Sequence, residues 1–88
     1  MYSPKQLKDM KMLQRRELTD HHMYLKLAKR QKDQHNKQVL TKLANDELGH
    51  YHFWKKITKV EMKPNRFQLC ISIFWYDFWN SLNGKRRR

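Results

Sequence analysis

The chain has 88 residues, with 20 Lys and Arg against 8 Asp and Glu, and a formal net charge of +12. This length allows one domain at most, and its core is so thin that we expect a metal, self-association or a partner segment to help stabilise it. The single cysteine, Cys70, excludes an intrachain disulfide, and the start Met1–Pro4 lacks the apolar stretch of a secretory signal. Both features predict a cytoplasmic protein.

The basic charge is spread along the whole sequence. Residues 1–63 carry 15 Lys and Arg against 7 Asp and Glu, and residues 64–88 add 5 against 1. Such a balance is compatible with binding to nucleic acid or to an anionic membrane surface. Because the basic residues are scattered around the predicted helices, we favour a solvated lysine-rich surface and expect no nucleic acid partner. A basic module that binds nucleic acid or anionic membranes remains the alternative function.

The first predicted element is a helix over about residues 4–32. Ser3 is suited to the N-cap and Pro4 to the first helical position. Residues at three- and four-residue steps then form one stripe, which is the helical period. The stripe consists of Leu7, Met10, Leu13, Glu17, His21, Tyr24, Ala28 and Gln31.

A polar break, Asp33–Asn36, separates this helix from a second one that ends before Pro64. The stripe of the second helix consists of Val39, Leu40, Leu43, Glu47, His50, Trp54 and Ile57. A short loop between two long helices makes them antiparallel neighbours. The predicted fold class is therefore all-α, with an antiparallel two-helix hairpin over residues 1–63.

Residues 64–88 form a tail that is aromatic and basic. Its apolar run, Leu69–Tyr76, is far shorter than the roughly 20 residues of a membrane-spanning helix. No clean helical or strand period is present between Phe67 and Leu82. We therefore predict an unstructured or poorly packed tail that is not part of the fold.

Glu17 interrupts the largely apolar stripe of the first helix, and Glu47 and His50 interrupt that of the second. Glu47 and His50 are three residues apart and so share one helical face. Glu17 lies 17 residues before Gln34, near the centre of the turn, and Glu47 and His50 lie 13 and 16 residues after it. In an antiparallel hairpin these positions come level. A buried carboxylate needs a partner, and mixed oxygen and nitrogen ligation suits iron or manganese, and zinc less exclusively.

The pattern of Glu17 on one helix and Glu47-Leu-Gly-His50 on the next resembles half of a ferritin-like di-iron site. The stretch from Glu17 to Arg30 is similar to the first helix of rubrerythrin-type domains. Leu43 to Lys56, followed by Lys63-Pro-Asn65, resembles the ferritin-like N-terminal domain of vacuolar-iron-transporter-like membrane proteins. The resemblance covers about residues 5–67.

This resemblance implies a four-helix bundle that binds two irons, with Glu17, Glu47 and His50 as ligands. It also implies that Tyr24 is a buried hydrogen-bonding neighbour, and that Asp20 and Asp46 are acids near the ligands or along an entry path. The related proteins would take up, oxidise or sense iron and pass it to a membrane transporter domain that this chain lacks. In this chain a homodimer would complete the site, and a monomer would bind one metal weakly. Whether the chain is a ferroxidase- or peroxidase-type enzyme stays open, because that chemistry needs both irons.

The tail departs from the related third helix, which contains Gly-x-x-x-Gly and then Leu-Met-Glu-Lys-Gly-Glu. If the codons of Trp75 and Trp79 are read one base later, each gives Gly, and the shifted tail can read Gly-x-x-Phe-Gly-x-x-Leu-Met-Glu-Lys-Gly-Glu. We hypothesise that the chain is out of frame from a point between Phe67 and Trp75, so that the bundle is truncated after about residue 67.

Other histidines are weaker candidates. His21 faces the stripe and is kept as an additional ligand of low rank, whereas His35 and His52 are expected in the turn and on the surface. A plain interaction hairpin, whose partner is another subunit and which binds no metal, is a further alternative.

Overall fold

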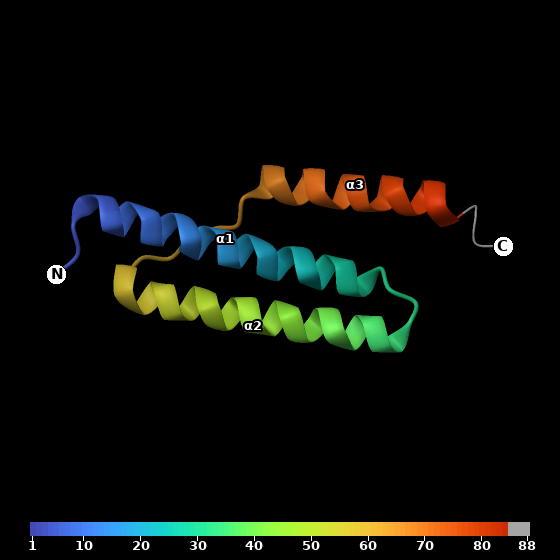
Figure 1. Cartoon of the computed structure of the whole chain (residues 1–88), viewed down its shortest axis with the longest axis horizontal. Coiled ribbons are helices and arrows are strands. Elements are labelled where there is room, and N and C mark those ends of the chain that lie inside the picture. Colours follow the sequence, from blue (N-terminus) through green and yellow to red (C-terminus); the bar gives the residue numbers. More distant parts are fainter. Residues whose placement is uncertain (85–88) are drawn as a thin grey trace.

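The computed structural model describes residues 1–84, which form three helices: α1 (Pro4–Lys29), α2 (Gln34–Thr58) and α3 (Arg66–Gly84). α1 and α2 lie side by side and antiparallel, and α3 runs along the C-terminal half of α1, on the side away from α2 (Figure 1). The predicted all-α class is confirmed. The prediction of only two helices is not confirmed, because the described part of the tail adds a third.

The ends of α1 are set by local hydrogen bonds. Ser3 and Gln6 form a capping box, in which the Gln6 amide donates to Ser3 Oγ (3.1 Å) and the Ser3 amide donates to Gln6 Oε1 (2.8 Å). The helix ends at Lys29, three residues before the predicted end, because the amides of Arg30 and Gln31 turn back to carbonyls three residues earlier. Asp33 then caps α2 through the His35 amide, so residues 34–36 belong to α2 and not to the loop.

Close packing of α1 on α2 depends on small side chains and on a few polar groups that are hydrogen-bonded. Ala28 and Ala44 are buried, Ala44 completely, which lets the helices approach each other. His21 is buried beside Ala44, and its Nδ1 lies 2.6 Å from the Ala44 carbonyl oxygen. This contact links the two helices. The ranking of His21 as an additional metal ligand is not supported, because the metal-capable group found among the described residues does not include it.

Gln14 ties the segment after α2 to α1. Its side chain is fully buried; Nε2 donates to the Val60 carbonyl (2.7 Å), and Oε1 accepts from the Thr58 hydroxyl. The Tyr51 hydroxyl accepts the Met62 amide at 3.1 Å. The backbone that leads from α2 to α3 is thus held against the hairpin by side chains of both helices.

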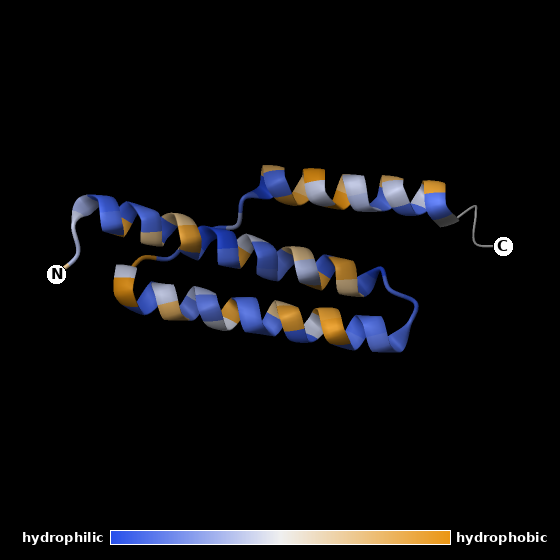
Figure 2. Cartoon of the chain, in the orientation of Figure 1, coloured by the Kyte–Doolittle hydropathy of each residue, from blue (hydrophilic) through white to orange (hydrophobic). Residues whose placement is uncertain are grey.

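The tail is not unstructured over residues 66–84, which are helical. The alternative prediction of a poorly packed tail agrees with its exposure, because Leu69 is its one buried hydrophobic residue among the described residues. Asn65 starts this helix by accepting the Gln68 amide through Oδ1 (3.1 Å), and no Pro or Gly interrupts residues 66–83. Figure 2 shows hydrophobic residues recurring along the whole length of α3. Because they occupy more than one face, they hide the period on which the prediction depended. The out-of-frame origin of the tail stays a hypothesis.

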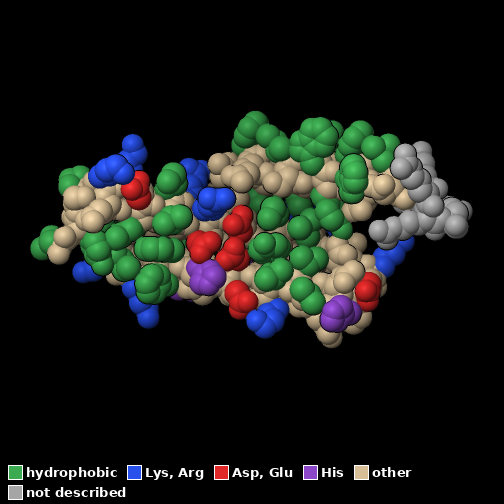
Figure 3. All heavy atoms as spheres, viewed as in Figure 1, with side chains coloured by type: hydrophobic (Ala, Val, Ile, Leu, Met, Phe, Trp, Pro, Cys, Tyr) green, Lys and Arg blue, Asp and Glu red, His purple; other side chains and the backbone are tan. Residues whose placement is uncertain are grey.

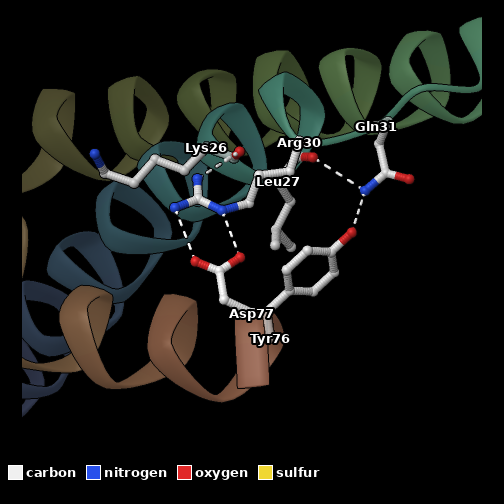
Figure 4. A network of polar contacts seen from close by, with 6 residues as sticks. All are labelled: Lys26, Leu27, Arg30, Gln31, Tyr76 and Asp77. Atoms are coloured by element: carbon white, nitrogen blue, oxygen red, sulfur yellow. Dashed lines mark hydrogen bonds and ion pairs between the residues drawn. The ribbon is translucent and has the colours of Figure 1, made fainter. Parts of the chain in front are cut away.

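α3 is attached to α1 by one buried leucine and by polar contacts at two levels. At its start, the Asn65 amide donates to Thr19 Oγ1 (2.9 Å), and Leu69 is buried. Further along, Arg30 forms a two-pronged pair with Asp77, with nitrogen–oxygen distances of 2.8 and 3.2 Å (Figure 4). Gln31 donates to the Tyr76 hydroxyl and to the Leu27 carbonyl in the same network (Figure 4).

We expect Leu69→Ala to loosen α3 without unfolding the hairpin. The substitution removes the one buried aliphatic side chain of α3 among the described residues, which costs about 2 kcal/mol of α3 attachment. Hydrogen exchange followed by mass spectrometry should show faster exchange in α3 and unchanged exchange in α1 and α2. Leu82→Ala is the matched control, because Leu82 is exposed on the same helix. Equal protection of α3 in the Leu69→Ala and Leu82→Ala variants would contradict this attachment.

Candidate metal centre

Glu17, Glu47 and His50 meet halfway along the hairpin, as their spacing predicts. Glu17 comes from α1, and the other two come from successive turns of α2. His50 Nδ1 lies 2.8 Å from Glu47 Oε1 and 3.0 Å from Glu17 Oε2. One ligand atom from each residue lies within 4.8 Å of the others. Two helices therefore direct two carboxylates and one imidazole at a common point.

The three side chains differ in their exposure to solvent. Glu17 and Glu47 expose 22% and 17% of their side chains, whereas His50 exposes 58%. Figure 3 shows acidic side chains grouped beside a histidine on the open face of the hairpin, with hydrophobic side chains on both sides along the long axis. The expectation of fully buried ligands is therefore too strong for a single chain, since no further helix covers this face.

Asp20 adds a third carboxyl group to the site. Its pKa is raised by burial, by the charge of Glu47 and by a side-chain hydrogen bond shared with Glu47, while Arg16 acts in the opposite direction. Burial also raises the pKa of Glu17, with further increases from the charges of Glu47 and Asp20. The folded chain thus concentrates negative charge at this point, and a cation would relieve the repulsion.

His50 is the group that relieves this repulsion in the absence of a metal. Its pKa is raised, first by the hydrogen bond to Glu47 and then by the charges of Glu17, Glu47 and Asp46, although burial opposes the shift. When protonated, its Nδ1–H can donate to either carboxylate. When His50 is protonated, the imidazolium pairs with the carboxylates, and binding of a metal ion would release that proton.

The other residues implied by the resemblance lie at different distances from this centre. Asp20 lies near it, since the charge of Glu47 helps to raise the pKa of Asp20, but the converging group itself consists of Glu17, Glu47 and His50. Asp46 is exposed and pairs with Lys42 at 3.3 Å, so it acts on His50 only through its charge. Tyr24 is half-buried and not fully buried, and the hydrogen bonds of the described residues do not include its hydroxyl. Its predicted role as a buried hydrogen-bonding neighbour is not supported by these contacts.

The raised pKa of His50 predicts a pH-dependent contribution to stability. A group whose pKa is raised on folding contributes stability that is fully present below its unfolded pKa and is lost as the pH rises through the folded value. For His50 the loss begins above 6.5, the ordinary pKa of a histidine side chain. We therefore expect His50→Gln to destabilise the metal-free chain more at about pH 5.5 than at about pH 8.5. Urea unfolding at the two pH values measures this difference, and equal losses would show that His50 does not pair with the carboxylates.

The three side chains offer donor atoms of the types that bind divalent transition metals. The Nδ1–oxygen distances of 2.8 and 3.0 Å are those of hydrogen-bonded ion pairs. They are also close to the roughly 3 Å that separates two donors bound at right angles to one ion at about 2.1 Å. The two carboxylates balance the charge of a divalent cation, and the imidazole supplies a neutral nitrogen.

The chain matches no protein-family model, no curated protein and no solved structure. The resemblance to rubrerythrin-type proteins therefore depends on the sequence pattern around Glu17, Glu47 and His50 alone. The roles of these residues as iron ligands stay predictions.

Proposed function

We propose that this chain binds transition-metal ions, iron first and manganese second, through Glu17, Glu47 and His50. The single observation that supports the proposal is the convergence of their ligand atoms, within 4.8 Å of one another, from two helices. Surface acids usually point away from one another into solvent, whereas these two are half-buried and share the same imidazole nitrogen.

The chemistry of the donors favours iron or manganese over other metals. A site that selects zinc or copper(I) commonly contains thiolates, and Cys70, the one cysteine of the chain, lies on α3 and not beside the cluster. A site for calcium or magnesium consists of oxygen ligands alone, whereas His50 contributes nitrogen. Two carboxylates with one imidazole suit Fe(II) and Mn(II).

We further propose that two copies of the chain complete a two-metal site. One chain offers three ligands from the cluster, which leaves coordination positions to be filled. α3 contacts α1 and leaves the face with the cluster open (Figure 3). Leu13 and Leu43, one turn before Glu17 and Glu47, are each 39% exposed on the hairpin. A second hairpin across this face would cover these leucines and bring a second set of ligands to the first, as in a four-helix bundle.

A pair of irons bound in this way would supply redox chemistry with oxygen or peroxide. The contribution of the chain itself is to bind and orient the metal and, through a second copy, to exclude water from it. Storage, uptake and oxidation of iron all begin with this binding step.

Sedimentation velocity in the presence and absence of Mn(II) tests the dimer and the metal together. We expect the chain to shift from monomer towards dimer when Mn(II) binds. Leu43→Glu should prevent the shift, whereas Thr41→Glu, an exposed position on the same helix, should not. A monomer that binds Mn(II) tightly would contradict completion by a second copy, and a chain that binds no metal would contradict the whole proposal.

A further inference from the structure

The side of α3 that faces away from α1 carries a continuous apolar surface. Leu69, Ile73 and Tyr76 lie on the other side, towards α1, and are buried or half-buried. The outward residues recur at three- and four-residue steps, and their exposure ranges from 40% at Ile71 to 75% at Phe67. We call this surface the aromatic face; it consists of Phe67, Ile71, Phe74, Trp75, Phe78, Trp79 and Leu82.

The aromatic face contains no charged residue. Arg66 and Asp77 are the charged residues of α3, and Asp77 is turned towards α1, where it pairs with Arg30 (Figure 4). An exposed apolar surface of this kind marks a binding surface for a protein or a membrane. None of the helices in the described part of the chain combines the length and the apolarity that crossing a lipid bilayer requires.

A cluster of basic residues lies next to the start of α3. Lys8, Lys11, Arg15 and Arg16 line a cleft of about 640 Å³ together with Asn65 and Gln68, and no acidic residue lines it. The ion pairs among the described residues use none of these four cations. The sequence-based view that the basic residues are scattered is therefore wrong for this half of α1, which concentrates positive charge in one place.

The basic cluster and the aromatic face occupy the same edge of the molecule. α3 covers the C-terminal half of α1, and the N-terminal half, which carries the cluster, continues along this edge (Figure 1). In Figure 3, Lys and Arg side chains lie above the N-terminal half of α1, and hydrophobic side chains follow along the top of α3. The metal cluster uses other residues, because Glu17, Glu47 and His50 neither line this cleft nor belong to the aromatic face. The two sites can therefore be tested with separate variants.

We propose that this edge docks on an anionic lipid bilayer surface, with α3 lying in the interface. Aromatic side chains insert favourably at the boundary between headgroups and acyl chains, and lysine and arginine beside them attract anionic headgroups. Binding to nucleic acid would use the basic cluster but would not explain the seven apolar residues of the aromatic face. Dimerisation through α3 of a second copy would use the aromatic face but would not explain the basic cluster. An anionic bilayer would interact with both features. The expected affinity for the bilayer depends on these side chains alone, so it holds whether or not the tail is out of frame.

Co-sedimentation of the full chain with lipid vesicles tests this proposal. The chain should bind phosphatidylcholine vesicles that contain about 30% phosphatidylserine more strongly than pure phosphatidylcholine vesicles. Raising the salt from about 0.1 M to about 0.5 M should weaken the binding. Ile71→Glu/Phe78→Glu should lower the partition coefficient at least about tenfold, with unchanged helix content, because both side chains point away from α1.

Charge reversal provides the matched comparison. Lys11→Glu/Arg15→Glu should weaken binding to anionic vesicles severalfold more than Lys37→Glu/Lys56→Glu, which changes the net charge equally on α2. Equal binding of the Ile71→Glu/Phe78→Glu variant, or equal binding to pure phosphatidylcholine, would overturn the proposal. Self-association through α3 in a chain that does not bind vesicles would also overturn it. The same holds if the chain binds duplex DNA but not vesicles, and DNA binding is unchanged by substitutions in the aromatic face.

Discussion

Replacing Glu47 by alanine is expected to lower the affinity of the chain for Mn(II) by at least about a hundredfold. Glu47 interacts with each of the other groups around the site. It accepts from His50 at 2.8 Å, and its charge raises the pKa of both Asp20 and Glu17. Its loss removes one ligand and leaves His50 without its nearest partner. Titration followed by the electron paramagnetic resonance signal of free Mn(II) measures the affinity.

Asp46→Ala is the matched control, because it removes one acidic residue from the neighbouring position while leaving the ligand set intact. Asp46 pairs with Lys42 in solvent, so its removal should change the affinity by less than about threefold. The affinity of the unchanged protein should rise with pH, because metal and proton compete for His50. If the Glu47→Ala and Asp46→Ala variants lost equal affinity for Mn(II), the cluster would not bind the metal specifically. The acidic residues would then attract cations only through their charge.

Replacing Gln14 by alanine is expected to lower the free energy of unfolding by about 2–4 kcal/mol. Gln14 is fully buried, and its amide satisfies the Val60 carbonyl and the Thr58 hydroxyl, which lie more than forty residues further along the chain. Alanine leaves both groups without this partner and opens a cavity. Urea unfolding followed by circular dichroism measures the change in the full-length chain.

Two further variants separate the causes of this loss. Gln14→Met preserves most of the volume but not the hydrogen bonds, so it should recover only part of the stability. Gln68→Ala removes an exposed glutamine from α3 and should stay within about 0.5 kcal/mol of the unchanged chain. If Gln14→Ala were as mild as Gln68→Ala, the segment after α2 would not be held by Gln14 in solution.

The two helices of the hairpin were predictable because local sequence and helical period agree. Ser3 and Pro4 fix the start of α1, and the stripe of Leu13, Glu17 and Tyr24 continues without interruption. The end at Lys29 was predicted three residues late, since Gln31 fits the stripe although its amide already turns back to Ala28. Period alone does not reveal this kind of turn.

α3 was not predicted because its apolar residues surround the helix. Leu69 and Ile73 face α1, while Phe74 and Phe78 face solvent, so no amphipathic stripe stands out. The sequence also contains no sign of the contacts that position α3: Arg30 with Asp77 and Gln31 with Tyr76 are more than forty residues apart. Such pairs follow from tertiary packing and not from local pattern.

The position of the candidate metal centre was predictable from the sequence, but its exposure to solvent was not. Counting residues from the turn placed Glu17, Glu47 and His50 at one level, and their ligand atoms do converge. The exposure of His50 could not be derived, because it depends on whether anything covers the open face. Asp20 was predicted as a nearby acid, and the effect of Glu47 on its pKa places it beside the cluster.

Elemental analysis after anaerobic loading with Fe(II) and removal of unbound metal tests the central claim most directly. The unchanged chain should retain about one iron atom per chain, as expected for half of a two-metal site. The Glu17→Ala and His50→Ala variants, each removing one ligand, should retain almost none. Equal iron in all three proteins would contradict binding by this cluster.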